Sequence, residues 1–329
     1  MESLSMWQSM CLLAADAPGA GVLRAEPPYT AIGWGVLLVV VALLVVDYFT
    51  RVGIIARAAM KEAIRQPLFL LMMAIGSSVI ILNIIMPFFA FDDDTTMFIE
   101  CGLATIQISA LLMAVWTAST SVADEIEGKT AMTLLSKPIN RQQFILGKYL
   151  GIVQSSLLMV LVMTVVFLAA TYFKYGYDQG EHGAQPPPLF YWRAAGNMQI
   201  PYLVQQRLEV ALSILPGIVL ICFEVLVLSA VSVAISTRFP MLVNVLTCLA
   251  VFVIGHLTPI LVHAGVHPVV RFVAQVFATI FPALDHFNLQ GASAQVNSAY
   301  LGFAAMYCAA YTIFMLMAAL ISFEDRDLA

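Results

Sequence analysis

The sequence predicts an all-α membrane protein, a polytopic bundle of about seven transmembrane helices. Hydrophobic residues make up 61% of its 329 residues and charged residues 11%, whereas a soluble domain is roughly 45–50% apolar and about 25% charged. Seven apolar stretches reach the roughly 17–25 residues that a bilayer-spanning helix needs. The 15 Lys and Arg are scattered, so no basic stripe indicates nucleic acid. The composition excludes a soluble enzyme, a disordered protein and a nucleic-acid-binding protein.

The predicted spans follow one another along most of the chain. Residues 1–30 are expected to form an extracytoplasmic segment, because the apolar patch Met6–Ala15 is too short to cross a bilayer. The first span, 31–49, is apolar on nearly every face, so it is not an amphipathic surface helix. Six further spans of the same kind are predicted at 67–90, 97–118, 148–172, 209–236, 241–264 and 298–322. The unit 67–329 is therefore a predicted six-helix domain, preceded by one additional helix.

The basic residues between the spans give the orientation. If the spans alternate in direction, one side of the membrane collects Arg51, Arg57, Lys61, Arg65, Lys129, Lys137, Arg141, Lys148, Arg238 and Arg326. The other side has fewer basic residues, most of them in a longer loop. The positive-inside rule places the first side in the cytoplasm. We therefore expect the N-terminus outside and the C-terminus in the cytoplasm.

Three segments between the spans have a character of their own. In 50–66, Ile and Ala recur at helical spacing with Arg and Lys on the other face, which is typical either of a basic stop-transfer flank or of an interfacial elbow helix. Residues 173–208 form the predicted outer loop, where Tyr191 and Trp192 suit the headgroup layer. Residues 265–290 are apolar but broken by prolines, and we interpret them as a re-entrant or interfacial helix on the outer side.

The cytoplasmic loop 119–148 has the most informative pattern. Ser121 precedes Asp124 at the spacing of a capping box, which predicts the start of a short helix. Pro138 ends that helix, because the residue before a proline avoids helical dihedral angles. Asn140, with Gln143 as its reciprocal partner, can cap a second helix that continues into the next span. The loop is therefore expected to form two short helices that project from the bundle.

The same loop resembles the cytoplasmic signature of type-2 ABC transporter permeases. The resemblance is carried by Glu125-Ile126-Glu127, Thr130, Leu134 to Ile139, Arg141 and Ile145 to Lys148. It is most similar to the branch grouped with permeases for multi-copper enzyme maturation. In that family an interfacial elbow precedes six spans, and the loop between the second and third of these docks on an ATP-binding subunit. Segment 50–66 and loop 119–148 fall where the elbow and the docking loop belong.

The resemblance implies a permease subunit that couples ATP hydrolysis on a separate chain to transport, with export as the expected direction. It implies three partners: an ATP-binding cassette subunit, a second permease copy or paralogue, and membrane lipids. The residues expected to couple the chain to the ATPase, by polar contact, anchoring or loop shape, are Glu125, Glu127, Thr130, Pro138, Arg141 and Lys148. The expected location is the plasma (inner) membrane of a bacterium.

The chain is not expected to hydrolyse ATP itself or to carry a cofactor. Gly128-Lys129-Thr130 imitates the end of a phosphate-binding loop, but the glycine that the motif needs five residues earlier is replaced by Ala123. An enzyme is therefore not the expected function.

Glu224 is the basis of the alternative hypothesis, in which the chain is a secondary transporter or ion channel. It lies near the middle of its span, where a charged carboxylate costs roughly 2.5–3.5 kcal/mol on insertion scales, so it should face the bundle interior. Its role there is either substrate or proton coupling or a hydrogen bond to a neighbouring helix. A membrane-embedded enzyme would need a cluster of His, Asp and Glu within the spans, where only Glu224, His256 and Glu100 are available. His256, His263 and His267 share a spacing that could bind copper or zinc, but we interpret them as interfacial polar residues and expect no metal.

Overall fold

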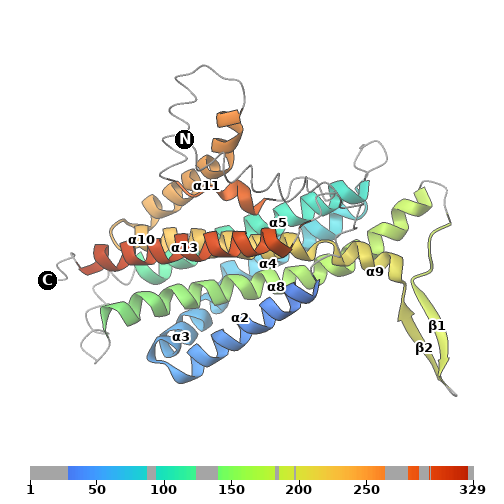
Figure 1. Cartoon of the computed structure of the whole chain (residues 1–329), viewed down its shortest axis with the longest axis horizontal. Coiled ribbons are helices and arrows are strands. Elements are labelled where there is room, and N and C mark those ends of the chain that lie inside the picture. The colour runs from blue at the N-terminus through green and yellow to red at the C-terminus, as the bar shows by residue number, and fades with distance from the viewer. Residues whose placement is uncertain are drawn as a thin grey trace, which may run out of the picture.

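The computed structural model describes residues 29–86, 94–123, 140–181, 185–195, 198–263, 281–288, 296 and 298–324. Long, nearly parallel or antiparallel helices form its body, and one two-stranded sheet projects from one end (Figure 1). The elements, in chain order, are α2 (Tyr29–Phe49), α3 (Arg51–Arg65), α4 (Pro67–Asn83), α5 (Asp94–Ala118), the π-helix η1 (Ser119–Ala123), α8 (Arg141–Glu181), β1 (Phe190–Ala195), β2 (Met198–Leu203), α9 (Gln205–Leu212), α10 (Leu215–Ser236), α11 (Met241–His263), the 3-10 helix η2 (Leu284–Phe287) and α13 (Ser298–Glu324).

Five helices within the described residues are long and apolar enough to cross a membrane. They are α2, α5 with the start of η1, α8, α9 joined to α10, and α13. A sixth is added if α3 and α4, which meet at a bend of 64°, are taken as one span. In α11 the apolar part Met241–Leu257 is shorter. The protein is thus a helical bundle compatible with several membrane crossings, while the count of seven stays a prediction.

The core lies where α5, α8 and α10 pack together. Phe98 of α5 meets Phe167 of α8 with ring centroids 5.7 Å apart, and both side chains are fully buried. Further along, Ile106, Met113 and Met163 are also fully buried. Helix α13 packs on α10, and the Phe323 ring stacks on Phe144 near the start of α8. By contrast, α2 has no buried residue and lies on the outside of the bundle against α3 (Figure 1).

Helix α3 forms within segment 50–66 and packs closely on α8. Its N-terminus is capped by Thr50, whose Oγ1 accepts a hydrogen bond from the Gly53 amide at 3.1 Å. Its buried face consists of small residues, Gly53, Ala56, Ala59 and Ala63. Ala56 and Ala59 face Gly151 of α8: a Cβ on Gly151 would lie 2.6 Å from the Ala59 Cβ and 2.7 Å from the Ala56 carbonyl oxygen. One turn earlier, a Cβ on Gly147 would lie 2.6 Å from the Ile55 Cβ. Small residues on both sides let the two helix backbones approach closely.

Helix α8 is a single helix of 41 residues. The second helix expected in loop 119–148 is therefore its first turns: the Asn140 amide donates to Gln143 Oε1 at 3.4 Å, which is the reciprocal half of the predicted cap. At 1.5 Å per residue α8 is about 60 Å long, whereas a bilayer with its headgroups is about 40–45 Å thick. A helix of this length that runs along the bundle extends beyond the membrane.

The stretch expected as an outer loop, 173–208, is largely ordered. Helix α8 continues through 173–181, and β1 and β2 then form an antiparallel hairpin, with Phe190 paired to Leu203 and Ala195 to Met198. Aromatic and β-branched residues favour such pairing. This hairpin is the exception to the otherwise helical architecture, and it projects beyond the ends of α2 and α10 (Figure 1).

One buried arginine fixes the hairpin to α8. Arg207 of α9 donates from Nη1 to the Tyr172 carbonyl at 3.1 Å and from Nη2 to the Pro187 carbonyl at 2.5 Å. Its guanidinium carbon lies 5.6 Å from the centroid of the Tyr172 ring. Gly176 makes room for it, because a Cβ there would lie 2.0 Å from Nη2. Tyr172 holds the base of the hairpin as well, because its hydroxyl donates to the Leu189 carbonyl at 2.6 Å and accepts from the Val204 amide at 3.1 Å.

Two predicted features fall at or beyond the edge of the described residues. Ser121 lies inside η1, which continues α5, so the expected helix start at this serine is wrong. Most of the segment 265–290 lies outside the described residues, and its described part contains η2.

Candidate functional site

Polar side chains surround two buried residues, Lys148 and Glu224, and form a cluster around each. We define the loop-base cluster as Glu62, Gln66, Thr120, Ser121 and Lys148, which lies next to the two ends of residues 124–139. We define the interior cluster as Gln107, Glu224 and His256, which lies inside the bundle. The two clusters correspond to the two functional hypotheses that the sequence raises.

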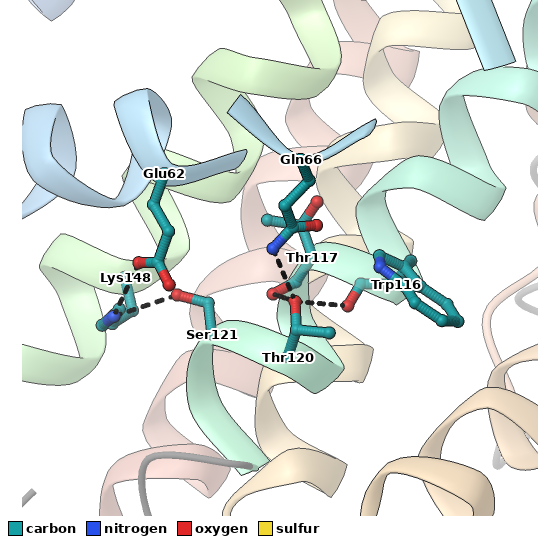
Figure 2. A network of polar contacts seen from close by, with 7 residues as sticks. All are labelled: Glu62, Gln66, Trp116, Thr117, Thr120, Ser121 and Lys148. Carbon is teal, nitrogen blue, oxygen red and sulfur yellow. Dashed lines mark hydrogen bonds and ion pairs between the residues drawn. The ribbon is translucent and has the colours of Figure 1, made fainter. Parts of the chain in front are cut away.

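Lys148 is the centre of the loop-base cluster. Its side chain is buried, and Nζ donates to Ser121 Oγ at 3.0 Å and lies 3.9 Å from Glu62 Oε2 (Figure 2). The same ammonium lies 5.9 Å from the centroid of the Phe144 ring, a cation–π distance. Glu62 belongs to α3, Ser121 to η1 and Lys148 to α8. One buried cation therefore connects three elements, two of which border the loop.

A second connection runs from the bend between α3 and α4 to η1. Gln66, the residue at the bend, donates from Nε2 to Thr120 Oγ1 at 3.2 Å, and Thr120 in turn donates to the Trp116 carbonyl at 3.1 Å (Figure 2). Among the residues that the structure describes, Gln66 Oε1 and Thr117 Oγ1 are buried without a hydrogen-bond partner. The hydrogen bonds between Gln66 and Thr120 therefore leave two buried oxygen atoms of this junction without a described partner.

The π-helix η1 is also tied to the far side of the bundle. Asn244 of α11 is fully buried, and its Nδ2 lies 2.7 Å from Ser119 Oγ, 2.9 Å from Ser232 Oγ and 2.8 Å from Ser236 Oγ. The Ser119 hydroxyl donates to the Val115 carbonyl, so it accepts from the amide. A π-helical turn is rare and occurs frequently at functional sites. The end of α5 is thus connected to α3, α8, α10 and α11 at once.

Some of the predicted coupling residues lie within the described residues, and the others lie outside them. Arg141, the first residue of α8, is exposed and lies 5.9 Å from the centroid of the Phe323 ring. Lys148 is buried in the loop-base cluster and does not face solvent. The others, Glu125, Glu127, Thr130 and Pro138, lie outside the described residues.

The sequence pattern assigns no functional role to Glu62, Gln66 or Asn244. An isolated amide in an apolar span, as Asn244 is, was the signal that could have found it, because such a group needs a partner on another helix. For Gln66 and Glu62, the partners are too distant in sequence for any local pattern to reveal them.

The interior cluster centres on Glu224 of α10. The side chain is fully buried, as expected from its position in the span, and Gln107 of α5 donates from Nε2 to Oε2 at 2.6 Å. On the other side, His256 Nε2 lies 3.7 Å from Oε1. His256 Nδ1 lies 3.0 Å from the Phe252 carbonyl, and because a carbonyl oxygen only accepts, Nδ1 carries a hydrogen. Glu224 is thus hydrogen-bonded to α5 through Oε2, while its Oε1 faces His256 of α11 beyond hydrogen-bond distance.

The described His, Cys, Asp and Glu residues do not form a metal site. Among the described residues, no group of three or more His, Cys, Asp or Glu could hold a metal ion. His267 lies outside the described residues, and the side chain of His263 is not described.

No family model matches the chain, and no curated protein matches it. The likeness to type-2 ABC permeases therefore depends on the residues of loop 119–148 themselves.

Proposed function

We propose that this protein is the membrane-spanning permease subunit of an ABC transporter, driven by a separate ATP-binding subunit that docks on loop 119–148. The observation that carries the proposal is the loop-base cluster. The two elements that border the loop, η1 and α8, are joined by the buried Lys148 and Ser121 pair, and α3 joins them through Glu62. A push on the loop would thus reach three helices at their common junction, as energy coupling requires.

The proposal assigns a role to each part of the bundle. Helix α3 is the interfacial elbow, its basic residues facing cytoplasmic headgroups, and α2 is the additional first span. The six remaining spans include α4, α5, α8, α10, α11 and α13, which makes seven in all, with the N-terminus outside. Two such subunits form a pair, a homodimer or a heterodimer with a second permease, because one bundle alone would leave a transport pathway open to lipid. The location is a bacterial plasma membrane.

Conformational change would pass along α8. Because this helix is unbroken from Arg141 to Glu181, a displacement of its first turn is carried through the bundle instead of being absorbed at a loop. ATP binding closes the two partner subunits, the docked loop shifts, and the interior of the paired bundles changes its access.

The test uses the complex reconstituted from this chain and the ATP-binding protein that copurifies with it. Glu125→Lys and Glu127→Lys reverse the charge of the proposed docking surface, so each should weaken the association and reduce ATPase activity. The matched control is Glu209→Lys, the same change at an exposed residue of α9. If no ATP-binding protein copurifies, or if the loop variants behave as the control does, the proposal fails.

A second candidate function rests on the interior cluster. Glu224 is fully buried and held between Gln107 and His256, which is the setting of an intramembrane coupling group in a secondary transporter or channel. This candidate predicts proton-coupled uptake by the chain alone, in vesicles without any ATP-binding protein, and its loss in Glu224→Gln. Uptake that requires ATP and survives this substitution would exclude it.

A further inference from the structure

Two buried atoms of the interior cluster face each other without a hydrogen bond. Glu224 Oε1 and His256 Nε2 lie 3.7 Å apart, and neither has a hydrogen-bond partner among the described residues. The His256 ring carries its hydrogen on Nδ1, which donates to the Phe252 carbonyl at 3.0 Å, so Nε2 of the neutral ring is an acceptor. An ionised carboxylate is an acceptor as well. Two facing acceptors leave both atoms unsatisfied, which is uncommon for buried polar groups.

A single proton satisfies both atoms. When Glu224 is a carboxylic acid, its Oε1 hydroxyl can donate to His256 Nε2 once the two side chains approach to hydrogen-bond length. The other oxygen, Oε2, is then the carbonyl oxygen that accepts from Gln107 Nε2 at 2.6 Å. Both oxygens of Glu224 and both ring nitrogens of His256 thereby have a partner. The same proton links α10 to α11.

The other titratable side chains around this part of α10 do not supply the missing hydrogen. Tyr149 of α8 and Cys308 of α13 donate instead to backbone carbonyl groups of α10, at 3.2 Å and 3.4 Å. The remaining titratable residues on the segments that pack there are Glu100 on α5, Cys222 on α10 itself, Asp285 and His286 on η2, and Tyr307 on α13. None of these is a lysine or an arginine, so His256 is the group among them that can share a proton with Glu224.

The surroundings favour the uncharged form of the pair. Glu224 is fully buried in a helix that is long and apolar enough to span a membrane, where two opposite charges are costly to desolvate. The His256 side chain is 20% exposed. The imidazole is therefore the side of the pair from which a proton can enter and leave.

We propose that Glu224 and His256 form a proton-binding site inside the bundle, in which the protonated carboxyl group donates from Oε1 to His256 Nε2 while Oε2 accepts from Gln107. The proton comes from water, and its binding converts the Glu224 carboxylate to the acid. The inference deepens the second candidate function, on which it rests only for the use that the bound proton has. Proton binding itself is a property of the chain alone.

The experiment records infrared spectra of the full-length chain in lipid nanodiscs at neutral pH, where the carbonyl stretch of a protonated carboxyl group is separate from that of a carboxylate. Glu224→Gln should remove one protonated-carboxyl band. His256→Phe should keep the band and move it to higher wavenumber, because the carboxyl group loses its acceptor. Phenylalanine preserves the ring contact with Phe252, whose centroid lies 4.5 Å from that of His256.

Matched controls are Glu209→Gln on α9 and His286→Phe on η2, both at exposed residues, and neither should change the band. If Glu224→Gln does not fold, nitrogen NMR of the unsubstituted chain with labelled histidine should show His256 as a neutral ring with an accepting Nε2. A doubly protonated His256, no band lost in Glu224→Gln, or a band that His256→Phe does not move would overturn the inference. A chain that shows the band but takes up nothing without ATP would refute the second candidate function and leave the proton site intact.

Discussion

At the scale of single residues, the buried polar side chains of this bundle join helices to one another. Gln154 of α8 lies 2.9 Å from both carboxylate oxygens of Asp47 on α2, and Lys148, Asn244 and Glu224 each bridge two or more elements. A buried polar group that loses its partner costs about 1–3 kcal/mol. Substitution at such positions therefore reports directly on the junction that it holds.

Lys148→Met tests the loop-base cluster. Methionine keeps most of the side-chain volume but leaves the buried Ser121 hydroxyl without its donor, so we expect the free energy of unfolding to fall by about 1–3 kcal/mol. Glu62→Gln should cost less than about 1 kcal/mol, because the Glu62 side chain is 54% exposed and its ion pair is screened by water. Denaturant unfolding in detergent measures both, with Lys61→Met, an exposed lysine of α3, as control. If Lys148→Met and Glu62→Gln lower the free energy of unfolding equally, the buried Lys148–Ser121 hydrogen bond is not the main contribution of this cluster.

Asn244→Leu tests the connection between η1 and the far side of the bundle. The substitution leaves the buried hydroxyl oxygens of Ser119, Ser232 and Ser236 without their common donor, and we expect a loss of about 1–3 kcal/mol in unfolding free energy. Adding Ser232→Ala should restore part of that loss, because one orphaned group is then removed. Thr247→Leu on the same helix is the control, since the Thr247 hydroxyl bonds only to the Val243 carbonyl of its own helix. If the losses in unfolding free energy of Asn244→Leu and Ser232→Ala simply add in the double variant, the two residues do not belong to one network.

At the scale of elements, two glycines of α8 let α3 pack closely against it. Gly151 of α8 lies against Ala56 and Ala59 of α3, and Gly147 lies against Ile55, so the two glycines let the helix backbones approach closely. Packing in membranes depends on such close approach, because lipid supplies no hydrophobic drive between helices.

Gly151→Val should separate these two helices. Its side chain would collide with the Ala59 Cβ at 2.6 Å and with the Ala56 carbonyl oxygen at 2.7 Å, and overpacking of this kind costs about 1–3 kcal/mol. Gly35→Val on α2 is the matched control, because nothing lies within 4 Å of a Cβ there. Thermal melting in detergent should show a clear fall for Gly151→Val alone. A fall of the same size in both variants would mean that the glycine matters for helix propensity and not for the contact.

At the scale of the whole molecule, the distribution of basic residues predicts a membrane orientation. The prediction that checks it uses a chain whose five cysteines have been replaced and to which single cysteines are added at Thr130 and at Gln185. A membrane-impermeant maleimide applied to intact cells should label the second site only, because the positive-inside rule places Thr130 in the cytoplasm. Labelling at Thr130 from outside would reverse the orientation and remove the basis for docking an ATP-binding subunit.

Much of the helical architecture could be predicted, because span length and apolar composition are local properties of the sequence. The end of α8 could not: 173–181 contains Lys174 and Asp178, which read as a polar loop. In the structure Lys174 Nζ lies 2.8 Å from Asp178 Oδ1 and both side chains are almost fully buried, so an i,i+4 ion pair keeps the stretch helical. The partners of Glu224, Lys148 and Asn244 come from other helices, and no local pattern contains such pairings.

The close contact of α3 with α8 has a mechanical consequence. Gly151 lies about 15 Å along α8 from Arg141 and about 45 Å from Glu181, at 1.5 Å per residue. If α8 pivots at that contact, a displacement of its first turn is magnified about threefold at its C-terminal end. A modest movement of the first turn of α8 then suffices to swing the hairpin held by Arg207.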